Sequence, residues 1–129
     1  MPFIMRIIVG LIGIVALLGV NPHWFNLDDL ASERGIEAIG AIGRANVRAD
    51  VGGLFLAIAL FALLAAAKQS RTWLLAAILV VGSALLGRFV SVAIDGYAAR
   101  VGPPMLTEAA IIAIFVLAYW AWGKKPEGL

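Results

Sequence analysis

Cysteine is absent from this 129-residue chain, and histidine occurs only once, at His23. The absence of cysteine excludes disulfides, thiolate metal sites and cysteine nucleophiles, and it leaves the redox compartment undetermined. A single histidine argues against a histidine-rich haem or zinc site, so we expect no metal and no cofactor. Charged residues are also scarce, at 14%, and the net charge is only +2. The longest basic run is the pair Lys124 and Lys125, so no nucleic-acid partner is expected.

Apolar residues dominate what remains: they make up 63% of the chain, and the mean hydropathy is +1.00. These values lie far outside those of a soluble domain of this length. The apolar residues fall into four stretches, at about 3–20, 47–67, 72–93 and 105–122. Each stretch would form a helix of about 27–33 Å, which matches a hydrocarbon core of about 30 Å. We therefore predict an all-α polytopic membrane protein, with a single domain at 1–129 and four transmembrane helices in an antiparallel bundle.

The first stretch also has the general features of a secretory signal peptide. Its charged leader is a single residue, Arg6, and it ends in Val20, Asn21 and Pro22 rather than in a small-x-small cleavage pattern. We therefore interpret it as a retained helix.

The segment 21–46 forms a predicted outer loop between the first two stretches. It contains an acidic group and apolar residues at near-helical spacing: Asp28, Asp29, Glu33 and Glu37, with Leu27, Leu30, Ile36, Ile39 and Ile42. The spacing predicts a short helix in the membrane interface, which Asp28 or Asp29 can cap and Gly35 can end. The other two connections, 68–71 and 95–104, are short and make neighbouring helices antiparallel.

Basic residues are divided equally between the two sides of the predicted membrane. The side of the termini has Arg6, Lys68, Arg71, Lys124 and Lys125, and the opposite side has Arg34, Arg44, Arg48, Arg88 and Arg100. On the opposite side, however, Arg48 and Arg88 lie inside predicted helices, and the loop arginines are mixed with acids. All three lysines closely flank helix ends on the other side. The positive-inside tendency therefore places both termini in the cytoplasm.

Glycines within the stretches predict close helix packing, because helices in lipid attract one another mainly through close backbone contact. We assign this role to Gly52, Gly53, Gly87 and Gly96. The pair Gly52 and Gly53 is not a phosphate-binding loop, because no Lys-Ser or Lys-Thr follows it and no strand precedes it.

Charges within the predicted helices are the most informative residues, because an ionised side chain deep in a bilayer costs at least about 2.5–3.5 kcal/mol unless it is paired or hydrated. Arg88, Ser91 and Asp95 are spaced three and four apart, which places them on one stripe of the third helix. Because the helices alternate in direction, the starts of the second and fourth helices lie at the same side of the membrane as the end of the third helix. We predict an outer polar cluster of Arg48, Asp50, Arg88, Ser91, Asp95 and Glu108.

Three interpretations of this cluster remain open. In the first, the cluster is a structural network in which the arginines bridge carboxylates and Arg48 extends outward. Alternatively, it is a site where Arg48 and Arg88 receive an anionic or carbonyl-bearing ligand and a carboxylate moves a proton. It can also be a surface for a partner protein.

No nucleophile with a neighbouring base supports catalysis. We expect a non-enzymatic membrane protein that contacts membrane lipid and binds a lipid-like or amphipathic ligand, or serves as an accessory or scaffold subunit with a membrane-protein partner or a second copy. The alternative is a small proton-linked transporter or an intramembrane enzyme that uses the same cluster.

Four sequence features resemble a bacterial family of small four-span proteins, the domain-of-unknown-function family 4345. They are the run Asn46-Val-Arg-Ala-Asp-Val-Gly-Gly-Leu-Phe-Leu-Ala57, then Gly87-Arg88-Phe89, Asp95-Gly96 and Glu108. The resemblance covers nearly the whole chain and singles out Arg48, Gly52, Gly53, Arg88, Asp95, Gly96 and Glu108. The sequence departs from the family at Asp50 and Val51, where an apolar and an aromatic residue are common.

The resemblance implies a four-span protein of the bacterial inner membrane and brings no established activity. A fainter similarity links the opening of the second helix to the four-span scaffold protein of fungal ergosterol biosynthesis.

Overall fold

The computed structural model describes residues 1–123, without the side chains of Leu30 and Ala31. Lys124 and Lys125, two of the basic residues that favour cytoplasmic termini, lie outside the described residues. The elements in chain order are α1 (Pro2–Phe25), α2 (Leu27–Glu33), α3 (Gly40–Asn46), the π-helical turn η1 (Val47–Gly52), α4 (Gly53–Lys68), α5 (Arg71–Asp95) and α6 (Gly102–Ala121). All regular structure in 1–123 is helical, which confirms the predicted all-α class.

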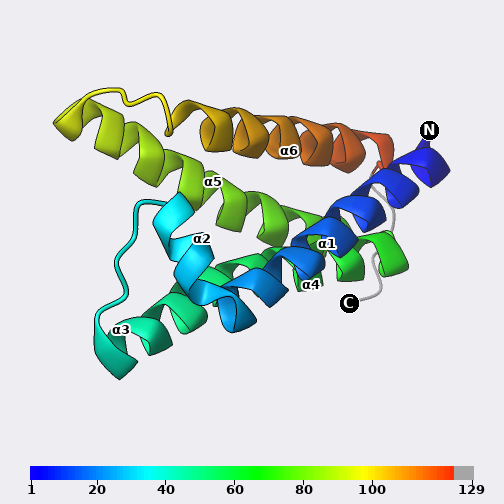
Figure 1. Ribbon diagram of the computed structural model, residues 1–129. Helices are drawn as coiled ribbons and strands as arrows, with labels where there is room; N and C mark the ends of the chain where they lie inside the picture. Colours follow the sequence, from blue (N-terminus) through cyan, green and yellow to red (C-terminus); the bar gives the residue numbers. More distant parts are fainter. Residues whose placement is uncertain (124–129) are drawn as a thin grey trace.

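Four helical segments are long and apolar enough to cross a membrane. They are Pro2–Phe25, Gly40–Lys68, Arg71–Asp95 and Gly102–Ala121, where the second combines α3, η1 and α4. The four run alternately in opposite directions, as Figure 1 shows. The protein is therefore a four-helix bundle of the integral-membrane type, as the hydropathy predicted.

The helices extend beyond the predicted spans, so 21–46 is not one loop. α1 continues through Pro22 to Phe25, because a proline near the end of a helix removes only one of its hydrogen bonds. α2 begins at Leu27 with Asp28 and Asp29 in its first turn. It ends at Glu33, two residues before a positive φ of 68° at Gly35, where glycine is favoured. The second crossing segment then begins at Gly40, seven residues earlier than predicted.

The hydrophobic core occupies one end of the bundle, which we call the closed end. Here α1 and α5 begin and α4 and α6 end, as Figure 1 shows. The core consists of Met5, Val9, Ala62, Ala65, Leu74, Ala77, Phe115, Ala118 and Trp122. Its alanines permit close backbone approach between helices, and Phe115 fills the space that they leave.

Hydrogen bonds between helix ends reinforce the closed end. The Trp122 indole N–H donates to the carbonyl oxygen of Pro2 at 3.2 Å, which joins the end of α6 to the start of α1. Arg6 donates to the carbonyls of Ala66 at 2.9 Å and Ala67 at 3.0 Å, which satisfies acceptors left free at the end of α4. α5 begins immediately afterwards, and the Ser70 hydroxyl accepts the N–H of Trp73 at 3.4 Å as its cap.

The four glycines assigned to helix packing behave differently. A Cβ on Gly52 would lie 2.7 Å from Nε1 of Trp24, so α1 approaches the second crossing segment closely there. A Cβ on Gly53 or Gly87 would meet nothing within 4 Å, so these two do not pack helices of this chain. Gly96 also has no such neighbour, and its φ of 83° instead ends α5. The assignment of Gly53, Gly87 and Gly96 to packing therefore needs correction, because spacing alone does not show which face of a helix has a neighbour.

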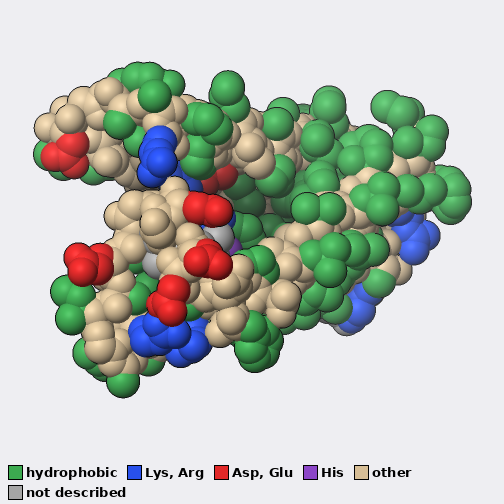
Figure 2. Space-filling model, viewed as in Figure 1, with side chains coloured by type: hydrophobic (Ala, Val, Ile, Leu, Met, Phe, Trp, Pro, Cys, Tyr) green, Lys and Arg blue, Asp and Glu red, His purple; other side chains and the backbone are tan. Residues whose placement is uncertain are grey.

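The opposite end, which we call the open end, contains α2, α3 and the turn between α5 and α6. There the α5–α6 pair separates from α1 and the second crossing segment, and α2 lies between them (Figure 1). Figure 2 shows charged side chains gathered around a hollow at this end, whereas hydrophobic side chains cover much of the rest of the visible face.

Candidate ligand cavity at the open end

An ion pair joins α5 to α6 at the open end. Nε of Arg88 donates to both carboxylate oxygens of Glu108, at 2.8 Å and 3.0 Å. The side chains are 33% and 16% exposed, so the pair is partly buried. An arginine has five N–H donors, and the terminal nitrogens of Arg88 make no hydrogen bond to any residue in 1–123. The pair therefore leaves several charge-assisted donors free for another acceptor.

Arg88 and Glu108 both line a cavity of about 600 Å³ between η1, α4, α5, α6 and the segment after α2. This open-end cavity has polar lining residues at one side, namely Arg34, Arg88, Thr107 and Glu108. The Thr107 hydroxyl already donates to the carbonyl of Pro103 at 3.0 Å. Most other lining residues are apolar. The size and the mixed lining are typical of ligand pockets in proteins, which are mainly apolar with a few polar groups.

Arg34 reaches this cavity from the segment that follows α2. Its guanidinium carbon lies 5.3 Å from the ring centre of Phe55, which is within the range of a cation–π contact. Partial burial, and then the like charge of Arg88, lower the pKa of Arg34 from its ordinary value, while Glu33 and Glu108 act in the opposite direction. An arginine stays protonated under such influences, so two like charges share the cavity.

Phe55 also contacts the single histidine, and the ring centres of Phe55 and His23 are 4.5 Å apart. His23 is almost fully buried, at 2% exposure, and its Nδ1 lies 2.6 Å from the carbonyl oxygen of Gly19. That contact makes Nδ1 the protonated nitrogen. Nε2 is buried and has no hydrogen-bond partner among the described residues. Because Phe55 lines the cavity, His23 supports its wall from behind.

A second cavity of about 470 Å³ adjoins the first and shares Arg34, Arg88 and Pro104 with it. We call it the mouth; Glu33 and Arg100 also line it. Across both cavities three guanidiniums face two carboxylates, which leaves one net positive charge. The arrangement is therefore suited to an anion that accepts several hydrogen bonds.

Arg48 does not join the ion pair as the predicted cluster requires. Its Nε donates to the carbonyl of Trp24 at 2.9 Å, and the Trp24 indole N–H donates back to the carbonyl of Arg48 at 3.2 Å. This reciprocal contact fixes η1 against the end of α1. It holds Arg48 away from the residues that line the open-end cavity and the mouth.

Three further members of the predicted cluster are exposed and have no hydrogen bond or ion pair to any residue in 1–123. They are Asp50, Ser91 and Asp95. Asp50 follows Arg48 by two residues and therefore points away from the anchored side of its helix. Ser91 and Asp95 continue the stripe of Arg88, but α5 extends past its neighbours at the open end, and residues 93–100 are all exposed. The predicted cluster is thus corrected to the pair of Arg88 and Glu108.

Sequence reasoning left Arg34 and Arg100 out of the site. Both were assigned to loops, where a charge ordinarily faces water. α2, which returns over the open end of the bundle, and the short α5–α6 connection bring these arginines beside Arg88, and hydropathy and spacing do not show the directions that these segments take. A neighbouring ion pair, between Arg44 and Asp28, joins α3 to α2 and helps to hold this part of the chain.

The structure defines a class: a four-helix protein of the integral-membrane type with an amphipathic cavity at one end. Within 1–123 no group of three or more histidine, aspartate or glutamate side chains is placed to hold a metal ion. Comparison with known proteins finds no matching family model, no significantly similar curated protein and no significantly similar solved structure. The resemblance to the four-span family therefore stays a prediction.

Proposed function

We propose that this protein binds a lipid-like or amphipathic anion in the open-end cavity and that it has no catalytic activity. One observation carries the proposal: a cavity of about 600 Å³ combines two arginines with otherwise mainly apolar walls. At Arg88 only Nε is engaged by a residue in 1–123, and the side chain is 33% exposed, so its terminal nitrogens are accessible to an acceptor that enters the cavity.

The proposed setting is the inner membrane of a bacterium, with both termini in the cytoplasm and the open end outside. Arg6, Lys68 and Arg71 lie close to helix ends at the closed end, whereas the five arginines of the open end lie within helices or among acidic residues. This difference in location supports the orientation through the positive-inside tendency. Because the chain has no cysteine, single introduced cysteines report sidedness without background. With an impermeant maleimide on intact cells, we expect Ala99→Cys to react and Ala67→Cys to react only after permeabilisation. The reverse pattern would overturn the orientation.

The binding proposal is tested by native mass spectrometry of the protein extracted gently from its own membrane. Arg88→Gln is compared with Arg48→Gln, which removes the same charge from the open end but does not touch either cavity. We expect a discrete bound mass on the wild type and on Arg48→Gln, and its loss from Arg88→Gln. Arg34→Gln is the second test, because Arg34 makes no hydrogen bond to a residue in 1–123 and its loss leaves the ion pair intact.

Two outcomes would contradict the proposal. If the wild type and every variant show only the mass of the protein without a ligand, the pair of Arg88 and Glu108 is a structural contact between α5 and α6. The open end would then be a surface for a partner protein. A bound mass that survives both Arg88→Gln and Arg34→Gln would place the ligand elsewhere on the protein.

A further inference from the structure

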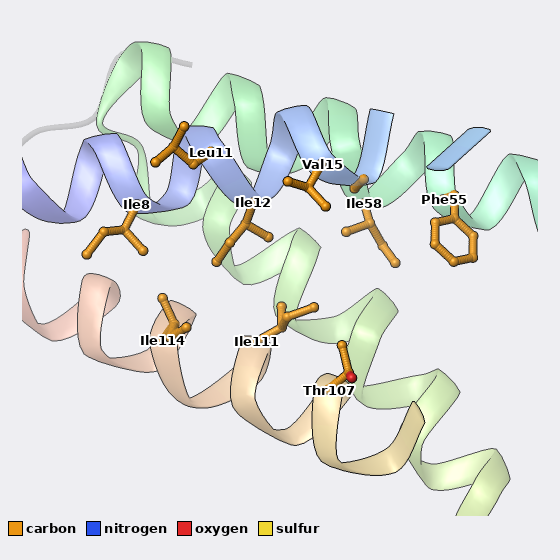
Figure 3. A pocket seen from close by; sticks show the side chains of 10 residues that line it. Ile8, Leu11, Ile12, Val15, Phe55, Ile58, Thr107, Ile111 and Ile114 are labelled. Atoms are coloured by element: carbon orange, nitrogen blue, oxygen red, sulfur yellow. The ribbon is translucent and has the colours of Figure 1, made fainter. Parts of the chain in front are cut away.

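A third cavity extends sideways from the open-end cavity between α1 and α6. This side groove has a volume of about 460 Å³. Figure 3 shows Ile8 and Ile12 of α1 pointing toward Ile111 and Ile114 of α6 across it. The hydroxyl of Thr107 is the polar side-chain group in its lining, and it is already bonded to a backbone carbonyl. The groove therefore offers a purely apolar environment.

The three cavities adjoin in series, because each shares lining residues with the next, and we take them together as one path. The side groove and the open-end cavity share Phe55, Ile58, Thr107 and Ile111. The open-end cavity and the mouth share Arg34, Arg88 and Pro104. Along this path the lining changes from entirely apolar to three guanidiniums. A molecule that fills the path has an apolar chain at one end and an anionic head at the other.

The change from charged to apolar lining is abrupt. Glu108 and Ile111 are three residues apart on α6, and Arg88 and Ala84 are four apart on α5, so each pair is separated by about one helical turn of 5.4 Å. A diacyl phospholipid carries polar glycerol esters between its phosphate and its chains. Those esters would lie against apolar residues that offer no hydrogen bonds, which is costly. In a fatty acid the carboxylate adjoins the chain directly, as this lining requires.

Resting on the proposed function, we infer that the ligand is a long-chain fatty acid with its ionised carboxylate at Arg88 and Arg34 and its chain in the side groove. A single negative charge balances the net positive charge of the open-end cavity and mouth. A dianionic head would leave an excess negative charge in a partly buried site. The groove lies between two helices that face the bilayer, so the chain enters sideways from lipid rather than through water.

The inference is tested with a fatty acid that carries a photoreactive diazirine in mid-chain, added to the protein in phosphatidylcholine vesicles. After irradiation, labelled positions are mapped by peptide mass spectrometry. We expect labelling of α1 and α6 at groove residues, and its loss in Arg88→Gln. Excess oleate should compete at least about tenfold better than its neutral methyl ester, because the ester lacks the charge that strengthens the hydrogen bonds to arginine.

Ala16→Phe places a ring in the groove, whereas Ala113→Phe places the same ring on an exposed position of α6 outside it. Only the first variant should lose groove labelling. Labelling unchanged in Ala16→Phe would overturn the assignment of the groove.

Competition by phosphatidylglycerol but not by oleate would overturn the fatty-acid inference while leaving the proposed anion site standing. If no anionic amphipath competes, and native mass spectrometry also finds no bound mass, the proposed function falls together with the inference.

Discussion

The two ends of this bundle are built from similar apolar helices but pack in different ways. At the closed end, alanines and a few large side chains leave the core residues at most 5% exposed. At the open end the same helices separate, and the space between them becomes a cavity lined mostly by partly exposed residues, from which the side groove continues toward the core. Close packing is thus concentrated where the helices touch, and cavity space where they do not.

Core substitutions should give the largest difference between the two ends. Phe115→Ala removes a fully buried ring at the closed end and should lower the free energy of unfolding by about 3–5 kcal/mol. Leu54→Ala, in the wall of the open-end cavity, enlarges an existing cavity at a half-buried position and should cost less, about 1–2 kcal/mol. Unfolding of both variants in the same detergent measures the difference. Equal losses would show that the open end is as well packed as the closed end.

Adjacent glycines provide the next comparison. Gly52→Ala forces a methyl group to within 2.7 Å of the Trp24 indole nitrogen and should destabilise the protein by about 1–3 kcal/mol. Gly53→Ala meets nothing and should be neutral or stabilising by up to about 1 kcal/mol, because alanine favours helix. Thermal unfolding followed by tryptophan fluorescence distinguishes them. Destabilisation by Gly53→Ala would indicate a neighbour at this face, such as a second copy.

The ion pair at the open end should affect binding more than stability. Glu108→Gln keeps an oxygen that can accept from Arg88 Nε but removes one negative charge from the cavity. We expect an anionic amphipath to bind severalfold more tightly, because the net positive charge of the open-end cavity and mouth rises. Titration with oleate measures the change, and Asp50→Asn outside the cavities is the control. Weaker binding to Glu108→Gln would mean that the full charge of Glu108 is needed to position Arg88 for the ligand.

The smallest effects should come from residues that the sequence placed in the polar cluster but the structure leaves exposed. Asp50→Asn and Ser91→Ala should each change the free energy of unfolding by less than about 0.5 kcal/mol and leave binding unchanged. Chemical denaturation and native mass spectrometry test both. A decrease of more than about 1 kcal/mol in the free energy of unfolding would indicate that these residues take part in a polar network.

The fold could be predicted because one strong signal decides it: the chain contains four apolar stretches of membrane-crossing length, and the last three are joined by short connections. Depth along the membrane was also predictable, which is why Arg88 and Glu108 were placed in one cluster. Rotation about the helix axis was not. Arg48 was predicted in the same cluster but is anchored to Trp24, and the loop residue Arg34 folds over Phe55. Contacts of this kind depend on tertiary packing, which spacing within one segment does not encode.

The π-helical turn η1 has a consequence for the register of the whole open end. A π turn contains more residues per turn than an α turn, and it commonly arises from one extra residue. Because six residues in a π turn rotate about as far as five in an α-helix, conversion of η1 to α geometry without a deletion would rotate the chain before it by about 100° relative to α4. The contact of Trp24 with Arg48 and that of Asp28 with Arg44 would then be out of phase, while the closed end would be unaffected. The π turn thus keeps the chain before it, and the contacts that this chain makes at the open end, in phase with the bundle that supports them.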